Sequence, residues 1–214
     1  MTEELAFARA WFDRFVEAFA RQKEYLGDLD RRSGDGDFAV NMASALRRAA
    51  ARIGELDSSA SDAEVFRAIA LGFIDTGGSS GPLLGMWFRA VSKAGDSAGY
   101  DLAKLAAGVR EGTDAVQRLG GAQPGDKTMV DAMVPAADSL AASVTANSRL
   151  DAALGEAARS ARAGADSTES LLASLGRASY VGEAAAGVVD PGAAAVALFF
   201  ESGAQACGQS VRAE

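Results

Sequence analysis

The sequence predicts an all-α protein, and three observations support this fold class. Apolar residues recur at helical spacing along most of the chain, and no segment alternates polar and apolar residues convincingly as a half-buried strand does. Alanine, the strongest helix former, is very common. The connections between the periodic segments are short, which favours antiparallel neighbours. We therefore expect an eight-helix antiparallel up-and-down bundle or barrel.

Each helix is expected from its apolar stripe or from the residues that begin it. Phe12, Phe15 and Phe19 lie on one face of the first helix. Pro82 suits the first turn of the fourth helix, and Asp190 is a typical cap for the last one. The expected helices are Glu3–Leu26, Phe38–Ile53, Asp62–Ile74, a fourth from Pro82, Asp101–Leu119, Thr128–Ser143, Arg149–Ala163, and a last one from Asp190-Pro191 to Ser210.

Length, charge and cysteine content limit the kind of protein. We expect a single domain over residues 1–214, which is long enough to bury a core. The net charge is −8 and the basic residues form no stripe, which disfavours a nucleic-acid partner. No apolar run reaches the roughly 18 residues of a membrane span, and the acidic start Met1-Thr2-Glu3-Glu4 is unlike a signal peptide. With Cys207 as its single cysteine, the chain is expected to be cytoplasmic.

The complete absence of histidine limits the chemistry further. No imidazole is available as a general base, a zinc ligand or a phosphoryl carrier. The remaining chemistry relies on carboxylates, backbone dipoles, Arg, Lys and a hard metal ion.

The connections are of two kinds, and these largely alternate along the chain. In an up-and-down bundle, alternate connections lie at the same end, so we expect the glycine-rich ones to converge at one mouth. The plain polar connections are Ala51–Ser61, Ala94–Tyr100 and the turn around Asn147; the glycine-rich ones are Gly27–Asp37, Thr76–Gly81, Gly120–Lys127 and Gly176–Pro191.

The first glycine-rich connection is a candidate metal site. Asp30, Asp35 and Asp37 lie within eight residues, with a glycine before each of the last two. Because Asp and Gly are poor helix formers, we expect this run to form a loop that turns the three carboxylates toward one point. Such an all-oxygen site suits Mg²⁺ together with phosphate. The alternative is a solvated acidic turn, as most Asp/Gly loops are.

Two further connections are candidates for binding an anion. The loop Thr76–Pro82 opens a helix, and the N–H groups at a helix start form a cradle for phosphate. In the loop Gly176–Pro191, the planar guanidinium of Arg177 suits an oxyanion. The alternatives are a flexible turn capped by serine and an ordinary surface arginine.

The loop Gly120–Met129 opens another helix, a second cradle for an anion, and is a candidate for lining a nucleotide. On this interpretation Thr128 or Lys127 lies near phosphate and Met129 lies against an adenine face. The alternative is a turn with a threonine cap and a core methionine. Together, a carboxylate cation site, two anion cradles and an arginine at one mouth indicate a Mg–nucleotide site.

Several of these motifs occur in the order found in one known family. They are Asp30 with Gly34-Asp35-Gly36-Asp37, Asn41-Met42, Gly77–Gly81 with Pro82-Leu83, Gly125–Asp131, Pro135-Ala136, Gly176–Tyr180 and Asp190-Pro191-Gly192-Ala193. In these residues the chain resembles the L subunit of bacterial dihydroxyacetone kinase, almost from end to end.

The resemblance implies an eight-helix barrel with ADP or ATP at one end and two Mg²⁺ ions held by Asp30, Asp35 and Asp37. It implies phosphate binding by Ser79 and Ser80. The other residues implied to lie at the nucleotide are Phe38, Asn41, Gly120, Gly121, Thr128, Met129, Arg177, Asp190 and Pro191.

The resemblance also implies partners. The family's ketose is bound to a histidine of a separate K subunit, so this histidine-free chain fits the L role: a phosphotransferase subunit acting on an alcohol group of dihydroxyacetone or a similar short ketose. A phosphocarrier protein as phosphoryl donor and a homodimer are further arrangements that the sequence leaves open.

One residue departs from the family pattern, which usually reads Gly-Asp-Gly-Asp-His-Gly. Phe38-Ala39 follows Asp37 here, and phenylalanine has no hydrogen bond to offer to phosphate. Two alternatives therefore stay open: a non-catalytic regulatory module that binds nucleotide, and a kinase subunit for another ketose such as a tetrulose.

Overall fold

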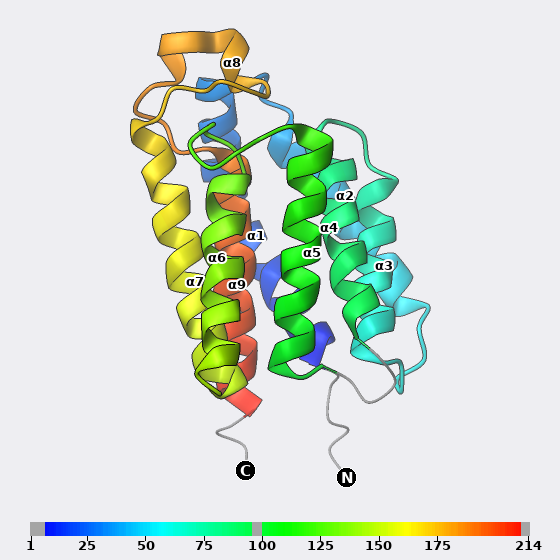
Figure 1. The fold of residues 1–214 in the computed structure, drawn as a ribbon. Coiled ribbons are helices and arrows are strands. Elements are labelled where there is room, and N and C mark those ends of the chain that lie inside the picture. The colour runs from blue at the N-terminus through cyan, green and yellow to red at the C-terminus, as the bar shows by residue number, and fades with distance from the viewer. Residues whose placement is uncertain (1–6, 96–99, 211–214) are drawn as a thin grey trace.

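The computed structural model describes residues 7–95 and 100–210, and every regular element within these ranges is a helix. In the described residues, eight longer helices run up and down the molecule, and a short α-helix, α8, covers one end (Figure 1). Their bounds are α1 Phe7–Ser33, α2 Phe38–Gly54, α3 Asp62–Ile74, α4 Ser80–Ala94, α5 Leu102–Gly120, α6 Val130–Thr145, α7 Leu150–Ser167, α8 Ala178–Val181 and α9 Pro191–Ser210.

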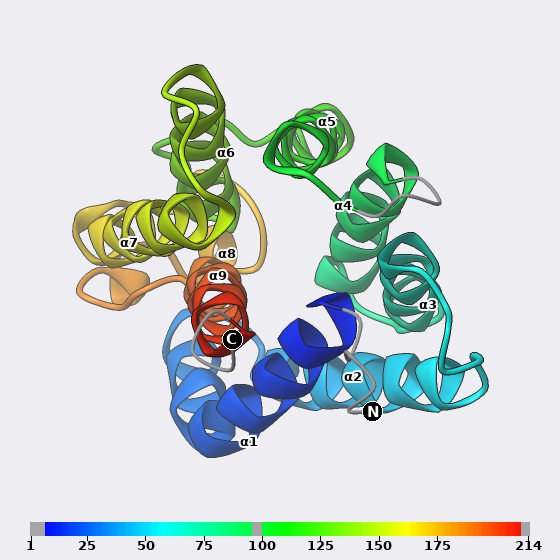
Figure 2. The same cartoon turned by 90° about the horizontal axis from the view of Figure 1, so that it is seen from below.

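The eight longer helices form a closed ring, which Figure 2 shows from below. Each helix packs against its neighbour in the chain, and α9 packs against both α7 and α1, so that it closes the ring. The prediction of an all-α, antiparallel eight-helix barrel is therefore confirmed. Within the described ranges, no helix combines the length and the hydropathy that crossing a membrane requires.

Aromatic side chains fill the middle of the ring. The rings of Trp11 from α1 and Phe199 from α9 stack with their centroids 4.4 Å apart, and Trp87 from α4 meets Phe199 edge-on at 5.4 Å. The indole N–H of Trp11 donates to the Phe199 carbonyl at 2.7 Å, so its polar group is satisfied in the core. Side chains from opposite parts of the ring therefore meet in a solid core.

Glycine allows some of the helices to approach closely. A Cβ on Gly164 of α7 would lie 2.0 Å from the backbone carbonyl oxygen of Asp131 in α6. A Cβ on Gly203 of α9 would lie 2.4 Å from the ring of Trp11. These contacts leave no space for a larger residue, because protein interiors are packed as densely as organic crystals.

The end of the first helix differs from its prediction. Helix α1 continues to Ser33, so Asp30 lies in its last turn and the expected loop Gly27–Asp37 is shortened to residues 34–37. The reason is burial: Leu26, Leu29 and Ser33 continue the inner face of α1 and are at most 3% exposed. Tertiary packing here outweighs the weak helix propensity of Asp and Gly.

Other boundaries differ by a few residues. Helix α4 begins at Ser80, which still leaves Pro82 in the first turn, where its missing N–H is not needed. Helix α6 begins at Val130, and α7 extends to Ser167. Helix α8 lies within the expected loop Gly176–Pro191 and was not predicted. The predicted start at Glu3 and residues 96–99 of the connection Ala94–Tyr100 lie outside the described residues.

Candidate functional site

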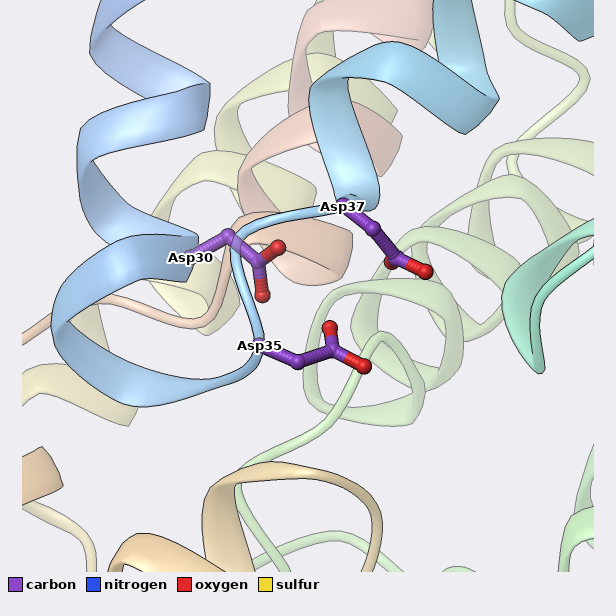
Figure 3. A group of neighbouring side chains, drawn as sticks. All are labelled: Asp30, Asp35 and Asp37. Carbon is purple, nitrogen blue, oxygen red and sulfur yellow. The ribbon is translucent and has the colours of Figure 1, made fainter.

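Three carboxylates converge at the end of the barrel where α1 ends and α2 begins (Figure 3). Asp30 belongs to the last turn of α1, Asp35 to the connection, and Asp37 directly precedes α2. Each contributes an oxygen, and these oxygens all lie within 4.8 Å of one another. Asp30 is buried, whereas Asp35 and Asp37 are exposed and open toward solvent.

The local backbone holds this cluster in place. The backbone N–H of Phe38 donates to Oδ2 of Asp30 at 2.8 Å, which ties the start of α2 to the end of α1. Gly34 fits at the turn because a Cβ there would lie 2.3 Å from Oδ1 of Asp30. Gly36 has a φ of +82°, a backbone conformation that favours glycine. The glycines between the aspartates are therefore needed to bring the carboxylates together.

The cluster concentrates negative charge. Burial, and then the neighbouring carboxylates of Asp35 and Asp37, raise the pKa of Asp30, while the N–H of Phe38 opposes this shift. The guanidinium of Arg177 lies 2.7 Å from Oδ2 of Asp35 and offsets part of the charge. An all-oxygen donor set with one buried and two accessible carboxylates fits a hard divalent cation such as Mg²⁺.

A cleft opens beside the carboxylates, at the mouth where the glycine-rich connections meet. It encloses about 920 Å³, part of which is open to solvent. Twelve of the fourteen residues predicted for the site line it: Asp30, Asp35, Asp37, Phe38, Ser79, Ser80, Gly120, Thr128, Met129, Arg177, Asp190 and Pro191. The convergence expected from alternating connections is therefore present in the structure.

Two predicted residues do not line the cleft. Asn41 lies one turn into α2 and close to the serine-containing loop, residues 76–82: a Cβ on Gly78 would lie 2.8 Å from its Nδ2. Gly121 ends α5 in the left-handed conformation and is exposed to solvent. The structure does not place these two residues on the cleft wall, and their part in nucleotide binding stays a prediction.

The serine-containing loop presents the start of a helix to the cleft. Ser79 is the N-cap of α4, but its hydroxyl makes no bond to the helix. A Cβ on Gly81 would lie 2.7 Å from the Thr76 carbonyl, so the tight first turn requires glycine. The N–H groups and the positive end of the helix dipole are therefore suitably placed for an anion in the cleft.

The opposite wall comes from the starts of α6 and α9. The carboxylate of Asp131 accepts from the N–H groups of Gly125 at 2.5 Å and Thr128 at 2.8 Å, which fixes the loop before α6. Asp190 caps α9, as predicted: its Oδ1 accepts from the Ala193 N–H at 2.7 Å. Burial, aided by the charge of Asp131, raises the pKa of Asp190 to about 7.

The ammonium of Lys127 does not lie where one sequence interpretation places it, which is near phosphate as an alternative to Thr128. Its side chain is 1% exposed, and its ammonium donates to the carbonyls of Thr168 and Val188. The residue borders the cleft, but its charged group is directed to backbone oxygens.

Part of the apolar lining of the cleft was not predicted, in contrast to Phe38, Met129 and Pro191. The additional apolar residues include Leu83, Val116, Ala122 and Leu175. Val116 lies on an apolar stripe of α5, and helical periodicity does not distinguish a core residue from one that faces a pocket. Leu83 directly follows Pro82 in the first turn of α4, beside the anion cradle. This position is the sequence signal that could have identified Leu83 as a cleft residue.

Several known proteins resemble this chain in sequence and in fold. The family model of the DAK2 domain matches residues 32–205. The chain is 34% identical over 203 residues to the ADP-binding subunit DhaL of PEP-dependent dihydroxyacetone kinase 1 of Listeria innocua, covering 94% of this chain and 96% of the relative. It is 36% identical over 202 residues to the corresponding DhaL subunit of Escherichia coli, covering 89% of this chain and 91% of that one.

Other relatives are longer. The chain is 40% identical over 196 residues to the D-erythrulose kinase of Mycolicibacterium smegmatis, which covers 89% of this chain but 33% of the kinase. The dihydroxyacetone kinase of C. freundii in its native form has a similar structure, with a TM-score of 0.71 and 27% identity over 92% of this chain and 34% of that one. Its complex with AMP-PNP and Mg²⁺ has a TM-score of 0.68 and 28% identity, covering 91% and 33% of the two chains.

Proposed function

Because the chain belongs to the DAK2 domain family, we propose that it is the ADP- or ATP-binding phosphotransferase subunit of a dihydroxyacetone-type kinase. In this role it transfers a phosphoryl group to a hydroxyl of a short ketose that a separate K-like subunit holds. One observation carries the proposal: the three-carboxylate cluster, the start of α4 and Arg177 all line one cleft.

Each wall of the cleft has a part in this chemistry. Asp30, Asp35 and Asp37 would hold Mg²⁺, which neutralises phosphate charge when it is bound. The helix start at Ser79 and Ser80 supplies N–H groups to phosphate oxygens, and the fork of Arg177 can turn from Asp35 to a phosphate. The wall formed by Met129 and Pro191 receives the nucleoside.

Two kinds of relative support different ketoses. Some relatives are ADP-binding subunits of dihydroxyacetone kinases. Two relatives from M. smegmatis are kinases of D-erythrulose and L-erythrulose. The proposed ketose site belongs to another subunit, so the choice of ketose is made there. The relatives named PEP-dependent support a phosphocarrier as the phosphoryl source, and the AMP-PNP complex supports ATP.

A second function, that of a nucleotide-binding regulatory module, is favoured by one residue. Phe38 is 7% exposed and borders the cleft, where its ring offers no hydrogen bond to phosphate. Such a module would bind Mg–ADP through the same carboxylates but would transfer no phosphoryl group.

Calorimetry with ADP tests the site that both functions require. We expect binding with Mg²⁺ and none with a chelator, because the carboxylates and the phosphates repel one another without the cation. Asp35→Asn and Asp37→Asn should each weaken binding by about tenfold or more, equivalent to about 1.4 kcal/mol. Asp28→Asn is the matched control, because Asp28 is an exposed α1 residue paired with Arg31. Equal ADP affinity with and without chelator would refute the site.

A further inference from the structure

Lys127 combines burial with an unusual backbone conformation. Its φ is +60°, and its side chain is 1% exposed. The left-handed conformation is strained for a non-glycine residue and persists where the surroundings enforce it. Gly125, two residues earlier, adopts a positive φ with open space around it. The chain thus retains a lysine at a position where glycine would be relaxed, which points to a use for the side chain.

The ammonium of Lys127 joins three segments that are distant in sequence. It donates to the Val188 carbonyl at 2.5 Å and to the carbonyl of Thr168, which directly follows α7. A cation at the C-terminal end of a helix is favoured by the helix dipole. The hydroxyl oxygen of Thr168 accepts from the Asp190 N–H at 2.8 Å. The loop before α6, the end of α7 and the segment before α9 are therefore linked through Lys127 and Thr168.

These linked segments form one wall of the cleft. They carry Met129, Asp190 and Pro191, which line it. The two parts of this wall are also in contact, since a Cβ on Gly192 would lie 3.3 Å from Cβ of Met129. The carboxylate cluster and the serine-containing loop belong to other elements, at α1, α2 and α4. Loss of the Lys127 link should therefore loosen one wall and leave the other in place.

The charge environment is consistent with this structural use. Burial lowers the pKa of Lys127, whereas the nearby carboxylates of Asp190, Glu169 and Asp131 act in the opposite direction. Its ammonium donates to two backbone carbonyls, that of Thr168 at the end of α7 and that of Val188 in the segment before α9. The ammonium is therefore engaged within the protein.

We propose that Lys127 is a positioning residue that fixes the α6–α9 wall for the nucleoside part of the nucleotide and does not bind its phosphates. This inference rests on the proposed function. It reassigns the lysine of the loop Gly120–Met129 from the phosphates to the wall that faces the base and sugar.

Two ligands separate the parts of the site: Mg–ADP and Mg–pyrophosphate, which lacks the nucleoside. We expect Lys127→Met to weaken Mg–ADP binding by about tenfold or more, since buried hydrogen bonds to a charged group are lost. The affinity for Mg–pyrophosphate should change by less than about twofold, which is well under 1.4 kcal/mol. Thr168→Val, which removes the acceptor for the Asp190 N–H and keeps the lysine, should give the same pattern. Lys93→Met, at an exposed lysine of α4, is the control.

The outcomes are distinct. An equal loss for both ligands would overturn the proposal, because Lys127 would then act on phosphate or on the whole site. A lower melting temperature with unchanged affinity for both ligands would overturn it by showing a role in stability alone. Failure of both variants to fold, seen by circular dichroism, would assign the lysine to folding and overturn it too. If the unmodified chain binds neither ligand, the proposed function itself fails.

Discussion

Asp190 shows how burial determines the charge of one side chain at the cleft. Its carboxyl caps α9 beside Asp131, and burial is the largest cause of a pKa of about 7. The pKa of an aspartate in an unfolded chain lies near its ordinary value of 3.8. Between these two values the unfolded chain loses the proton and the folded chain keeps it. The free energy of unfolding must therefore fall as the pH rises through this window.

Asp190→Asn should show that slope directly. Asparagine is also a good N-cap and carries no charge, so the variant should gain stability relative to the unmodified protein as the pH rises from 4 to 7. The gain should grow by at most about 1.4 kcal/mol per pH unit and then level off. Urea denaturation of both proteins at pH 5 and pH 8 measures it. A gap that is equal at the two values would contradict the raised pKa.

The ion pair of Arg177 with Asp35 is expected to matter for binding more than for stability. The Arg177 side chain is 55% exposed, and exposed pairs contribute about 0–1 kcal/mol. Arg177→Gln should therefore leave the melting temperature nearly unchanged but weaken Mg–ADP binding. Arg52→Gln breaks the similarly exposed pair with Asp75 and is the matched control. A large loss of stability in Arg177→Gln without a change in affinity would contradict this division.

At the scale of elements, the sequence predicted which helices exist better than where they end. Apolar stripes and caps located all eight longer helices, and Asp190 begins the last one as expected. The end of α1 differs from its prediction because the helix propensity of Asp and Gly does not reveal the burial of Leu29 and Ser33, which depends on the closed ring. The interpretation that places Lys127 near phosphate, as an alternative to Thr128, fails for a similar reason, since the carbonyl partners of Lys127 belong to segments 41 and 61 residues away.

Two glycines on α7 separate packing from helix propensity. A Cβ on Gly164 would lie 2.0 Å from the Asp131 carbonyl oxygen, whereas a Cβ on Gly155 would meet only the flexible end of Arg159 at 3.8 Å. Gly164→Ala should therefore destabilise the protein by about 1–3 kcal/mol through overpacking. Gly155→Ala should stabilise it by up to about 1 kcal/mol, because alanine favours the helix. Chemical denaturation compares them, and equal effects would contradict close packing of α6 and α7.

At the scale of the whole molecule, the mouth was predictable because it follows from topology. Glycine-rich connections alternate with plain ones, and an up-and-down ring brings alternate connections to one end. The shape of the cleft was not predictable, because no sequence signal distinguishes apolar lining residues such as Val116 and Leu175 from residues of the core. Their place follows from how α4, α5 and the segment before α9 meet around the opening.

The proposed function requires a second subunit, and the mouth has exposed side chains that such a partner could contact. Tyr180, which is 88% exposed, and Leu172, which is 62% exposed, lie in the segment that covers the mouth and are available to a partner. We expect no ketose phosphate from this chain alone with labelled ATP, and turnover once a K-like subunit is added. Turnover by the chain alone would make it a complete kinase and contradict the proposal. A nucleotide-binding chain that stays inactive with the partner would favour the regulatory module.

The closure of the ring by α9 against α1 has one more consequence. The first turn of α1 and the last turns of α9 are neighbours at the end opposite the mouth, where Gly203 touches Trp11 (Figure 1). The helices can therefore keep the same neighbours around the ring if the two ends are joined and the chain is opened at another connection. A circular permutant that joins these turns by a short linker and opens in the exposed stretch 57–59 should retain the barrel. Its new ends would still lie away from the mouth, so the cleft would be free for an immobilised nucleotide sensor.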